Sequence, residues 1–246
     1  MIEIQELTKS FNGNLVWENV SFTIEDGERV AIIGRSGSGK SVLLKHLNAL
    51  MYPDSGTVML DGQNIFDMAY TELRKMRQKF GILFQGSALF DSINTFENIA
   101  FPLRFFTKQS EQEITRNVEE ALELVNLGGS GNKDTSELSG GMRKRVGLAR
   151  AIILKPDYLL YDEPTSGLDP ETSDEINELI VSTAESLDIT SIVVTHDMHS
   201  VLKVAEKVAF IANKELCWVG SIEEMRKSNN QDLLNFITAS EYRIKE

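Results

Sequence analysis

A phosphate-binding loop is the feature of this sequence that most restricts its fold. Residues 34–41 match the pattern G-x-x-x-x-G-K-[ST]. The loop follows a short apolar, β-branched run at residues 30–33, and it precedes residues 41–47, whose apolar side chains recur at helical spacing. Because a strand, a glycine-rich turn and a helix N-terminus direct several backbone N–H groups at one anion, the motif predicts a site for a phosphate group.

The pattern also assigns individual side chains to a nucleotide and its metal ion. The Lys40 ammonium would reach the outer phosphates, and the Ser41 hydroxyl would coordinate Mg²⁺. A chance glycine-rich turn is the alternative, and the strand and helix on either side make it the weaker interpretation. The loop residues that we expect to bind the nucleotide are Gly34, Ser36, Gly37, Ser38, Gly39, Lys40 and Ser41.

Composition indicates a globular chain that works in a reducing compartment. The 246 residues carry a formal net charge of −12, which disfavours nonspecific binding to DNA or to anionic lipid. Cys217 is the only cysteine, so no disulfide within the chain is possible. No apolar run approaches the roughly 18 residues needed to cross a bilayer, and the first residues carry acids where a secretory signal carries bases. We therefore expect a cytoplasmic protein unless a partner holds it at a membrane.

Strand and helix patterns alternate along the chain. Short apolar or alternating runs predict strands at residues 2–7, 20–24, 57–60, 158–161, 191–194 and 208–211. Helical spacing predicts helices at residues 71–76, 111–127 and 171–187. This alternation favours a parallel sheet with covered faces, beside which residues 88–150 would form a helical insertion. The tail, residues 222–246, predicts one or two helices that either cap their own domain or reach a second copy of the chain.

Two adjacent acids end one of the predicted strands. Asp162 and Glu163 follow the apolar run at residues 158–161. Burying carboxylates without a partner is unfavourable, but a bound Mg²⁺ offsets that cost. We expect Asp162 to hold the ion, and Glu163 to act as general base or to orient the attacking water. A solvated turn formed by the two acids is the alternative.

A second helix start offers another anion site. Ser139 is an N-cap residue, and Gly140 and Gly141 permit close backbone approach to the first turn of the helix that follows. One nucleotide does not need two such sites, so we expect each chain to present this helix end to the nucleotide on a second copy. Serine followed by two glycines is also a common helix start, and a purely structural role is the alternative.

Together these motifs resemble the nucleotide-binding subunit of ABC transporters, and the resemblance covers nearly all of the chain. Residues 138–141 match the family's LSGGQ signature, with Met142 in place of its glutamine. The resemblance implies ATP and Mg²⁺ as cofactors, with Ser41, Gln85 and Asp162 around the metal. It further implies that Gln85 lies in the Q-loop, which senses Mg²⁺ and the lytic water, and that Asp169 lies in the D-loop. His196 would be the switch histidine at the γ-phosphate, and Phe11 would be the aromatic that stacks on adenine.

The same resemblance implies a fold and a division of the chain. The fold would be α/β, a P-loop NTPase of the RecA-like kind, with a parallel-sheet core, an N-terminal antiparallel β subdomain and an inserted α-helical subdomain. Residues 1–246 would form a single ABC ATPase domain. Within it, residues 1–87 with 151–222 would make the core, residues 88–150 the helical signature subdomain, and residues 223–246 a C-terminal helical tail.

One segment points to a group within this family. Residues 83–104 are similar to the ATPases that serve MCE-protein lipid transporters, the MlaF-like group. This similarity implies an ATPase that powers phospholipid transport at the cytoplasmic face of the inner membrane. Its partners would be a second copy of the chain, a MlaE-like permease, a MlaD-like MCE subunit and a small STAS-type regulatory subunit, without nucleic acid. Apolar surface at residues 88–106 would form the groove for a permease helix, although core packing is the alternative for Phe90, Phe96 and Phe101.

Other ABC functions share the same motifs. ATPases of DNA repair and chromosome organisation place a long coiled coil between the phosphate loop and the signature, whereas only the 98 residues from 41 to 138 separate Lys40 from Ser139 here. The acidic composition also disfavours that class. A non-lipid importer or exporter, or a cell-division regulator with the same ATPase, stays open as an alternative.

Overall fold

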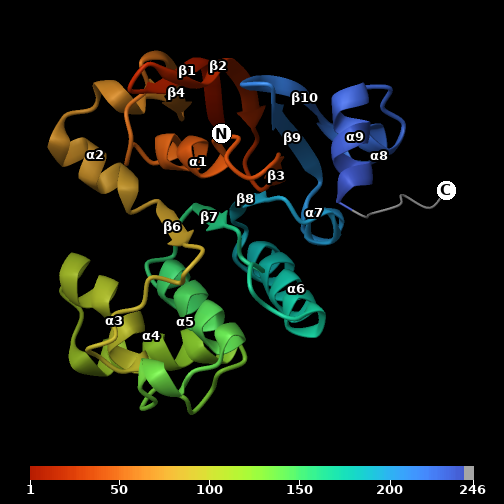
Figure 1. Ribbon diagram of the computed structural model, residues 1–246. Coiled ribbons are helices and arrows are strands. Elements are labelled where there is room, and N and C mark those ends of the chain that lie inside the picture. Colours follow the sequence, from red (N-terminus) through yellow and green to blue (C-terminus); the bar gives the residue numbers. More distant parts are fainter. Residues whose placement is uncertain (241–246) are drawn as a thin grey trace. The chain divides into compact units, whose positions relative to one another are not determined.

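The chain folds into two compact units. The structure is a computed structural model, and it describes residues 1–240. The first unit comprises Met1–Arg77 and the chain from Thr190 onward, and the second unit comprises Gln78–Ile189. The end of the predicted C-terminal tail, residues 241–246, lies outside the described residues. Figure 1 labels most helices and strands of both units.

An antiparallel sheet opens the first unit. Its strand order is β2-β1-β4-β5. The strands are β1 (Ile2–Phe11), β2 (Asn14–Ile24), β4 (Ser55–Leu60) and β5 (Gln63–Asn64). Ile2 lies opposite Ile24 on one side and Leu60 on the other, so buried apolar side chains of three strands meet. Asn12 and Gly13 both have positive φ, 50° and 79°, as a tight hairpin turn between β1 and β2 requires.

A second set of strands in the first unit carries the phosphate loop. Their order is β10-β9-β3-β8, with β3 parallel to both of its neighbours and β10 antiparallel to β9. The strands are β3 (Arg29–Ile33), β8 (Thr190–Thr195), β9 (Lys207–Ala212) and β10 (Glu215–Ser221). The helices of this unit are α1 (Lys40–Leu47), α2 (Tyr70–Arg77), α7 (Met198–Val204), α8 (Ile222–Arg226) and α9 (Gln231–Ala239), with a 3-10 turn η1 (Ile65–Asp67). All six residues of β8 are buried, as expected of a parallel strand covered on both faces.

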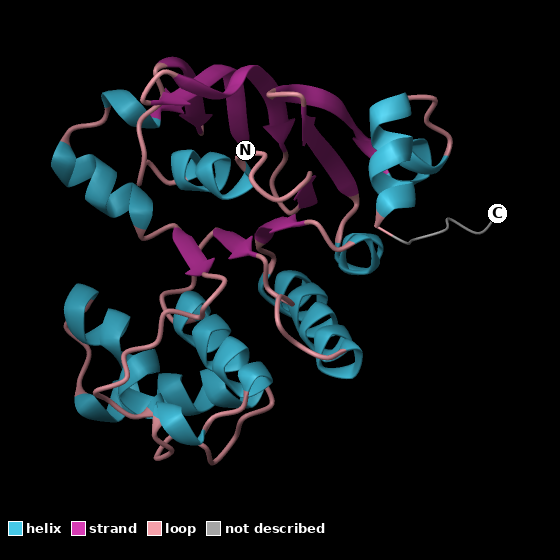
Figure 2. Cartoon of the chain, viewed as in Figure 1, coloured by secondary structure: helices cyan, strands magenta, loops and turns pink. Residues whose placement is uncertain are grey.

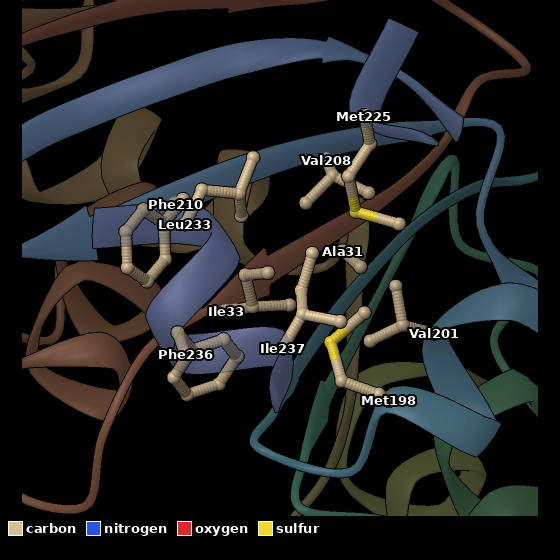
Figure 3. Close-up of a cluster of buried hydrophobic side chains, with 10 residues drawn as sticks. All are labelled: Ala31, Ile33, Met198, Val201, Val208, Phe210, Met225, Leu233, Phe236 and Ile237. Atoms are coloured by element: carbon tan, nitrogen blue, oxygen red, sulfur yellow. The ribbon is translucent and has the colours of Figure 1, made fainter. Parts of the chain in front are cut away.

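The C-terminal helix α9 packs against the strands of its own unit. Leu233, Phe236 and Ile237 form its buried face, and they join Ile33 of β3 and Phe210 of β9 in one apolar cluster (Figure 3). The ring centroids of Phe210 and Phe236 lie 5.3 Å apart. Burial of a side chain of this size stabilises a fold by about 1.5–3 kcal/mol. This packing agrees with the interpretation of the tail as a cap on its own domain.

The second unit is mainly helical (Figure 2). Its strands β6 (Phe80–Leu83) and β7 (Tyr158–Asp162) run parallel, with Leu83 opposite Tyr161. Its helices are α3 (Thr95–Phe106), α4 (Glu111–Leu124), α5 (Gly140–Ile152) and α6 (Pro170–Leu187), with a 3-10 turn η2 (Thr135–Glu137). Helix α4 begins at a capping box in which Ser110 and Glu113 each accept a hydrogen bond from the other's backbone N–H.

These elements confirm the predicted α/β fold class. The antiparallel β subdomain, the parallel strands and the helices inserted between β6 and β7 are all present. Each predicted strand and helix overlaps an observed one, and most observed elements are a few residues longer. Among the described residues, no helix combines the length and the apolar character that crossing a membrane requires.

Candidate functional site

The phosphate loop joins β3 to α1 in the first unit. The buried Lys40 side chain turns back over the loop, and its Nζ donates to the carbonyl oxygens of Gly34 (2.9 Å) and Arg35 (3.2 Å). The hydroxyl oxygen of Ser38 is buried and lacks a hydrogen-bond partner in the structure. A buried hydroxyl of this kind needs a partner, and a phosphate oxygen bound in the loop would supply one. The loop is therefore built to receive an anion.

Gly39 shows why the loop requires glycine immediately before α1. Its φ is 90°, and a Cβ there would lie 2.4 Å from Val16 Cγ1 and 2.6 Å from Trp17 Nε1. The indole of Trp17, which is fully buried, donates to the Gly39 carbonyl over 3.3 Å. Gly39 also caps α1 without a side chain, which leaves the N–H groups of the first turn directed at the loop.

A cavity of about 720 Å³ lies beside the phosphate loop in the first unit. This volume is in the usual range for a small-molecule site, about 300–1,000 Å³. Its lining includes phosphate-loop residues, the β1–β2 hairpin, the β9–β10 turn and the polar edge of α9. The lining residues that bear on nucleotide binding are Phe11, Val16, Arg35, Ser36, Gly37, Ser38, Asp232 and Asn235. The α9 residues were not predicted from the sequence, because their place in the cavity depends on how the tail packs.

Phe11 ends β1 at the rim of this cavity. Its side chain is 43% exposed, which is unusual for phenylalanine and leaves ring surface available for stacking. Lys9 Nζ lies 5.3 Å from the ring centroid and also pairs with Asp54 over 2.9 Å. A phenylalanine with this exposure is not part of the core, and its position beside the loop is suited to an adenine ring.

Replacing Phe11 with alanine should therefore weaken ATP binding. Loss of one aromatic–base stack costs about 1–3 kcal/mol, which corresponds to about 5- to 150-fold in the dissociation constant. Titration with a fluorescent ATP analogue measures this constant, and Phe11→Tyr, which keeps the ring, serves as the matched control. Equal affinity of the alanine and tyrosine variants would remove Phe11 from the adenine site.

His196 leaves the sheet beside the phosphate loop. In the parallel register of β3 and β8, Ile33 lies opposite Thr195, so Gly34 and His196 are the next residues of neighbouring strands. His196 is exposed, and the following residue, Asp197, caps α7 by accepting from the backbone N–H groups of His199 (3.0 Å) and Ser200 (3.3 Å). The structure thus brings together the predicted switch histidine and the phosphate loop at one sheet edge.

The second unit brings the predicted catalytic acids together with the Q-loop. Asp162 ends β7, Glu163 follows it, and both side chains are half-buried. Leu83 of β6 pairs with Tyr161 of β7, so Gln85 and Glu163, each two residues further along, occupy matching register positions. The Gln85 amide nitrogen donates to the Ser166 hydroxyl over 3.3 Å. Within the second unit, the Asp162 carboxylate and the Gln85 amide oxygen are hard oxygen donors, the kind that Mg²⁺ prefers.

The signature serine starts α5 as predicted. Ser139 is exposed, and its hydroxyl accepts from the backbone N–H of Met142 over 3.2 Å. A Cβ on Gly141 would lie 2.6 Å from the Thr172 methyl group, so only glycine permits this approach of α5 to α6. Asp169 caps α6 by accepting from the Thr172 N–H (3.0 Å) and hydroxyl (2.7 Å).

These bonds lower the pKa of the Asp169 carboxyl, mainly through the backbone N–H of Thr172. Asp169 thus stays charged as a helix cap, next to the start of the signature helix. A contact of Asp169 with the nucleotide across a dimer stays a prediction.

The sequence did not reveal Lys144 of α5, which is buried and donates to the backbone of both Gln85 and Glu163.

The chain is similar to ATP-binding proteins of known transport systems. A family model described as ABC transporter matches residues 17–166. The probable ribonucleotide transport ATP-binding protein mkl of Mycobacterium bovis is 43% identical over 236 residues, which are 96% of this chain and 66% of that protein. The intermembrane phospholipid transport system ATP-binding protein MlaF of Haemophilus influenzae is 39% identical over 237 residues, 96% of this chain and 90% of that protein.

A solved structure is similar over most of the fold. The dimeric post-hydrolysis state of the ATP-binding cassette MJ0796, bound to ADP and Pi, has a TM-score of 0.82 and 31% sequence identity, and the match covers 90% of this chain and 99% of that one. The chain spans slightly less than two thirds of the length of the mycobacterial relative. The matched family model and these relatives show that the chain belongs to the ABC transporter family, as an ATP-binding subunit and ABC-type ATPase.

Proposed function

We propose that this chain hydrolyses ATP as one half of a head-to-tail homodimer. The phosphate loop of one copy and the helix start at Ser139, Gly140 and Gly141 of the other would enclose each ATP. The dimeric state of the similar ATP-binding cassette supports this arrangement. The exposure of Ser139 at an N-cap supports it too, because a second chain can reach this helix end.

Within each site, we assign the chemistry to groups at the ends of buried strands. Glu163 would accept a proton from the attacking water or would orient it. His196 would contact the γ-phosphate. Ser41, Asp162 and Gln85 would bind Mg²⁺, which would neutralise charge on the phosphate oxygens. Phosphoryl transfer to water needs only positioning and charge stabilisation, so no covalent intermediate is required.

We propose further that the ATPase powers phospholipid transport between membranes. The observation that carries this proposal is the similarity to MlaF, which extends over 96% of this chain and 90% of that protein. On this proposal the chain lies at the cytoplasmic face of the inner membrane and assembles with a MlaE-like permease, a MlaD-like MCE subunit and a small STAS-type regulator. Transport of another solute is the second candidate, and the name of the mycobacterial relative, which refers to ribonucleotides, favours it.

An aromatic surface on the second unit suits a permease contact. Phe101, Phe105 and Phe106 of α3, together with Phe90 before it, are between 39% and 60% exposed. Their rings contact one another: the centroids of Phe90 and Phe101 are 5.0 Å apart, and those of Phe105 and Phe106 are 4.8 Å apart. The core alternative does not account for Phe90 and Phe101, which are 44% and 43% exposed. We assign this aromatic surface to a cytoplasmic helix of the permease.

Co-purification tests both the transported class and this surface. A tagged chain extracted from its native membranes should carry a permease and an MCE-type protein, identified by mass spectrometry. Recovery of DNA, a division protein or an amino-acid permease would contradict phospholipid transport. Phe105→Asp should lose the permease, because burying an unpaired charge in an apolar contact is unfavourable. A matched Tyr70→Asp variant, on an exposed aromatic of the first unit, should keep it.

A further inference from the structure

Lys144 is a buried cation with no assigned role. It lies in the second turn of α5, and its side chain is only 4% exposed. Lysine is rarely buried to this extent, because its ammonium loses its hydration and must find partners in the protein. Desolvation accordingly lowers the Lys144 pKa, an effect that the negative charges of Asp162 and Glu163 partly oppose.

The partners of Lys144 belong to two catalytic segments. Its Nζ donates to the carbonyl oxygen of Gln85 (2.5 Å) and to that of Glu163 (3.2 Å). These two residues follow the parallel strands β6 and β7 at equivalent register positions. One side chain from the signature helix thus joins the backbone of the Q-loop to the backbone of the proposed general base.

The backbone of Glu163 needs such support. Its φ is 49°, in the left-handed region that costs a residue with a Cβ about 1–2 kcal/mol. The Glu163 carbonyl accepts from Lys144 Nζ and from the backbone N–H of Ser166 (3.2 Å). Because φ and ψ set the direction of the Cα–Cβ bond, holding this conformation also sets where the Glu163 carboxylate points.

We propose that Lys144 is a positioning residue that holds Gln85 and Glu163 in register for ATP hydrolysis. This inference rests on the proposed role of Glu163 in hydrolysis. Since Lys144 lies five residues after Ser139, a shift of the signature helix would be transmitted directly to both segments. Lys144 therefore links the proposed dimer contact at the helix start to the geometry of the water-activating group.

Replacing Lys144 with methionine removes both hydrogen bonds and keeps most of the side-chain volume. A misplacement of about 1 Å can lower a rate about 100-fold, so we expect kcat for ATP to fall by about 10- to 100-fold. KM and the affinity of the monomer for ATP should stay within about twofold, since the phosphate loop supplies binding. Lys144→Gln retains N–H donors and should recover part of the lost kcat.

Arg145→Met is the matched control. Arg145, the next cation on α5, bonds to the Val125 carbonyl (3.0 Å) and the Glu175 carboxylate (2.8 Å), away from the catalytic segments. The Arg145→Met variant should have the kcat of the wild type even if its melting temperature falls. Here kcat is expressed per ATP-binding site, and the sites are titrated with a fluorescent nucleotide. Titration of sites keeps the comparison valid where a variant folds only in part.

Three outcomes would overturn the inference. They are an unchanged kcat in Lys144→Met, an equal loss of kcat in Arg145→Met, and a methionine variant as active as the glutamine variant. Glu163→Gln, measured in parallel, separates this failure from that of the underlying role. If Glu163→Gln stays active, the assignment of Glu163 is wrong; if it is inactive while Lys144→Met is fully active, only the positioning role is wrong.

Discussion

Glu163→Gln should bind ATP and Mg²⁺ normally and hydrolyse it at least about 100-fold more slowly, the loss expected when a general base is removed. The amide keeps the shape of the side chain but cannot accept the proton of the attacking water. Because ATP then persists between the two copies, the protein should remain a dimer. Steady-state phosphate release measures the rate, and light scattering after size-exclusion chromatography measures the mass.

A second glutamate controls for the change in charge. Glu119 is exposed on α4, outside the proposed site, and Glu119→Gln alters net charge in the same way. That variant should hydrolyse ATP at the wild-type rate and return to monomers as ATP is consumed. Undiminished hydrolysis by Glu163→Gln would remove Glu163 from the catalytic role.

Ser139→Arg should lower the ATPase rate by about 100-fold or more, while each monomer still binds nucleotide. The arginine would place a long charged side chain at an exposed helix start that should meet the phosphates bound by the other copy. It would also remove the N-cap hydroxyl that accepts from Met142. Fluorescent-ATP titration at low protein concentration gives the monomer's affinity, and phosphate release gives the rate.

A serine in the preceding turn provides the control. Ser136 is exposed in η2, three residues before Ser139, and Ser136→Arg adds the same side chain outside the signature. It should hydrolyse ATP at close to the wild-type rate. If Ser139→Arg instead lost nucleotide affinity as an isolated monomer, the proposed placement of the signature across the dimer would be wrong.

Contiguous motifs explain why much of the site could be predicted from the sequence. The phosphate loop and the pair Asp162 and Glu163 each consist of neighbouring residues at the end of a buried strand. Short-range spacing therefore carries both the local structure and the chemistry. The register of β3 with β8 then brings His196 beside the loop, as the general rule for parallel sheets predicts.

Contacts between distant segments could not be predicted in this way. Lys144 reads as one of several cations on α5, and only its burial and its bonds to Gln85 and Glu163 reveal a different role. The place of Asp232 and Asn235 in the cavity likewise depends on the packing of α9. The left-handed backbone of Glu163, whose carbonyl accepts from Lys144, likewise has no signal in the sequence.

In the proposed dimer, each ATP lies between the phosphate loop of one copy and the signature of the other. A disulfide between two chains tests it directly, with Ser36→Cys in one chain and Ser139→Cys in the other, both exposed serines in the wild type. Both chains carry Cys217→Ser, so each holds a single cysteine and neither alone can form the tested pair. Both also carry Glu163→Gln, so that ATP persists between the two copies. Mixed with ATP and Mg²⁺ under mild oxidation, they should give a disulfide-linked heterodimer that ADP does not support. Absence of this product while both chains bind ATP, or its formation regardless of nucleotide, would contradict the account.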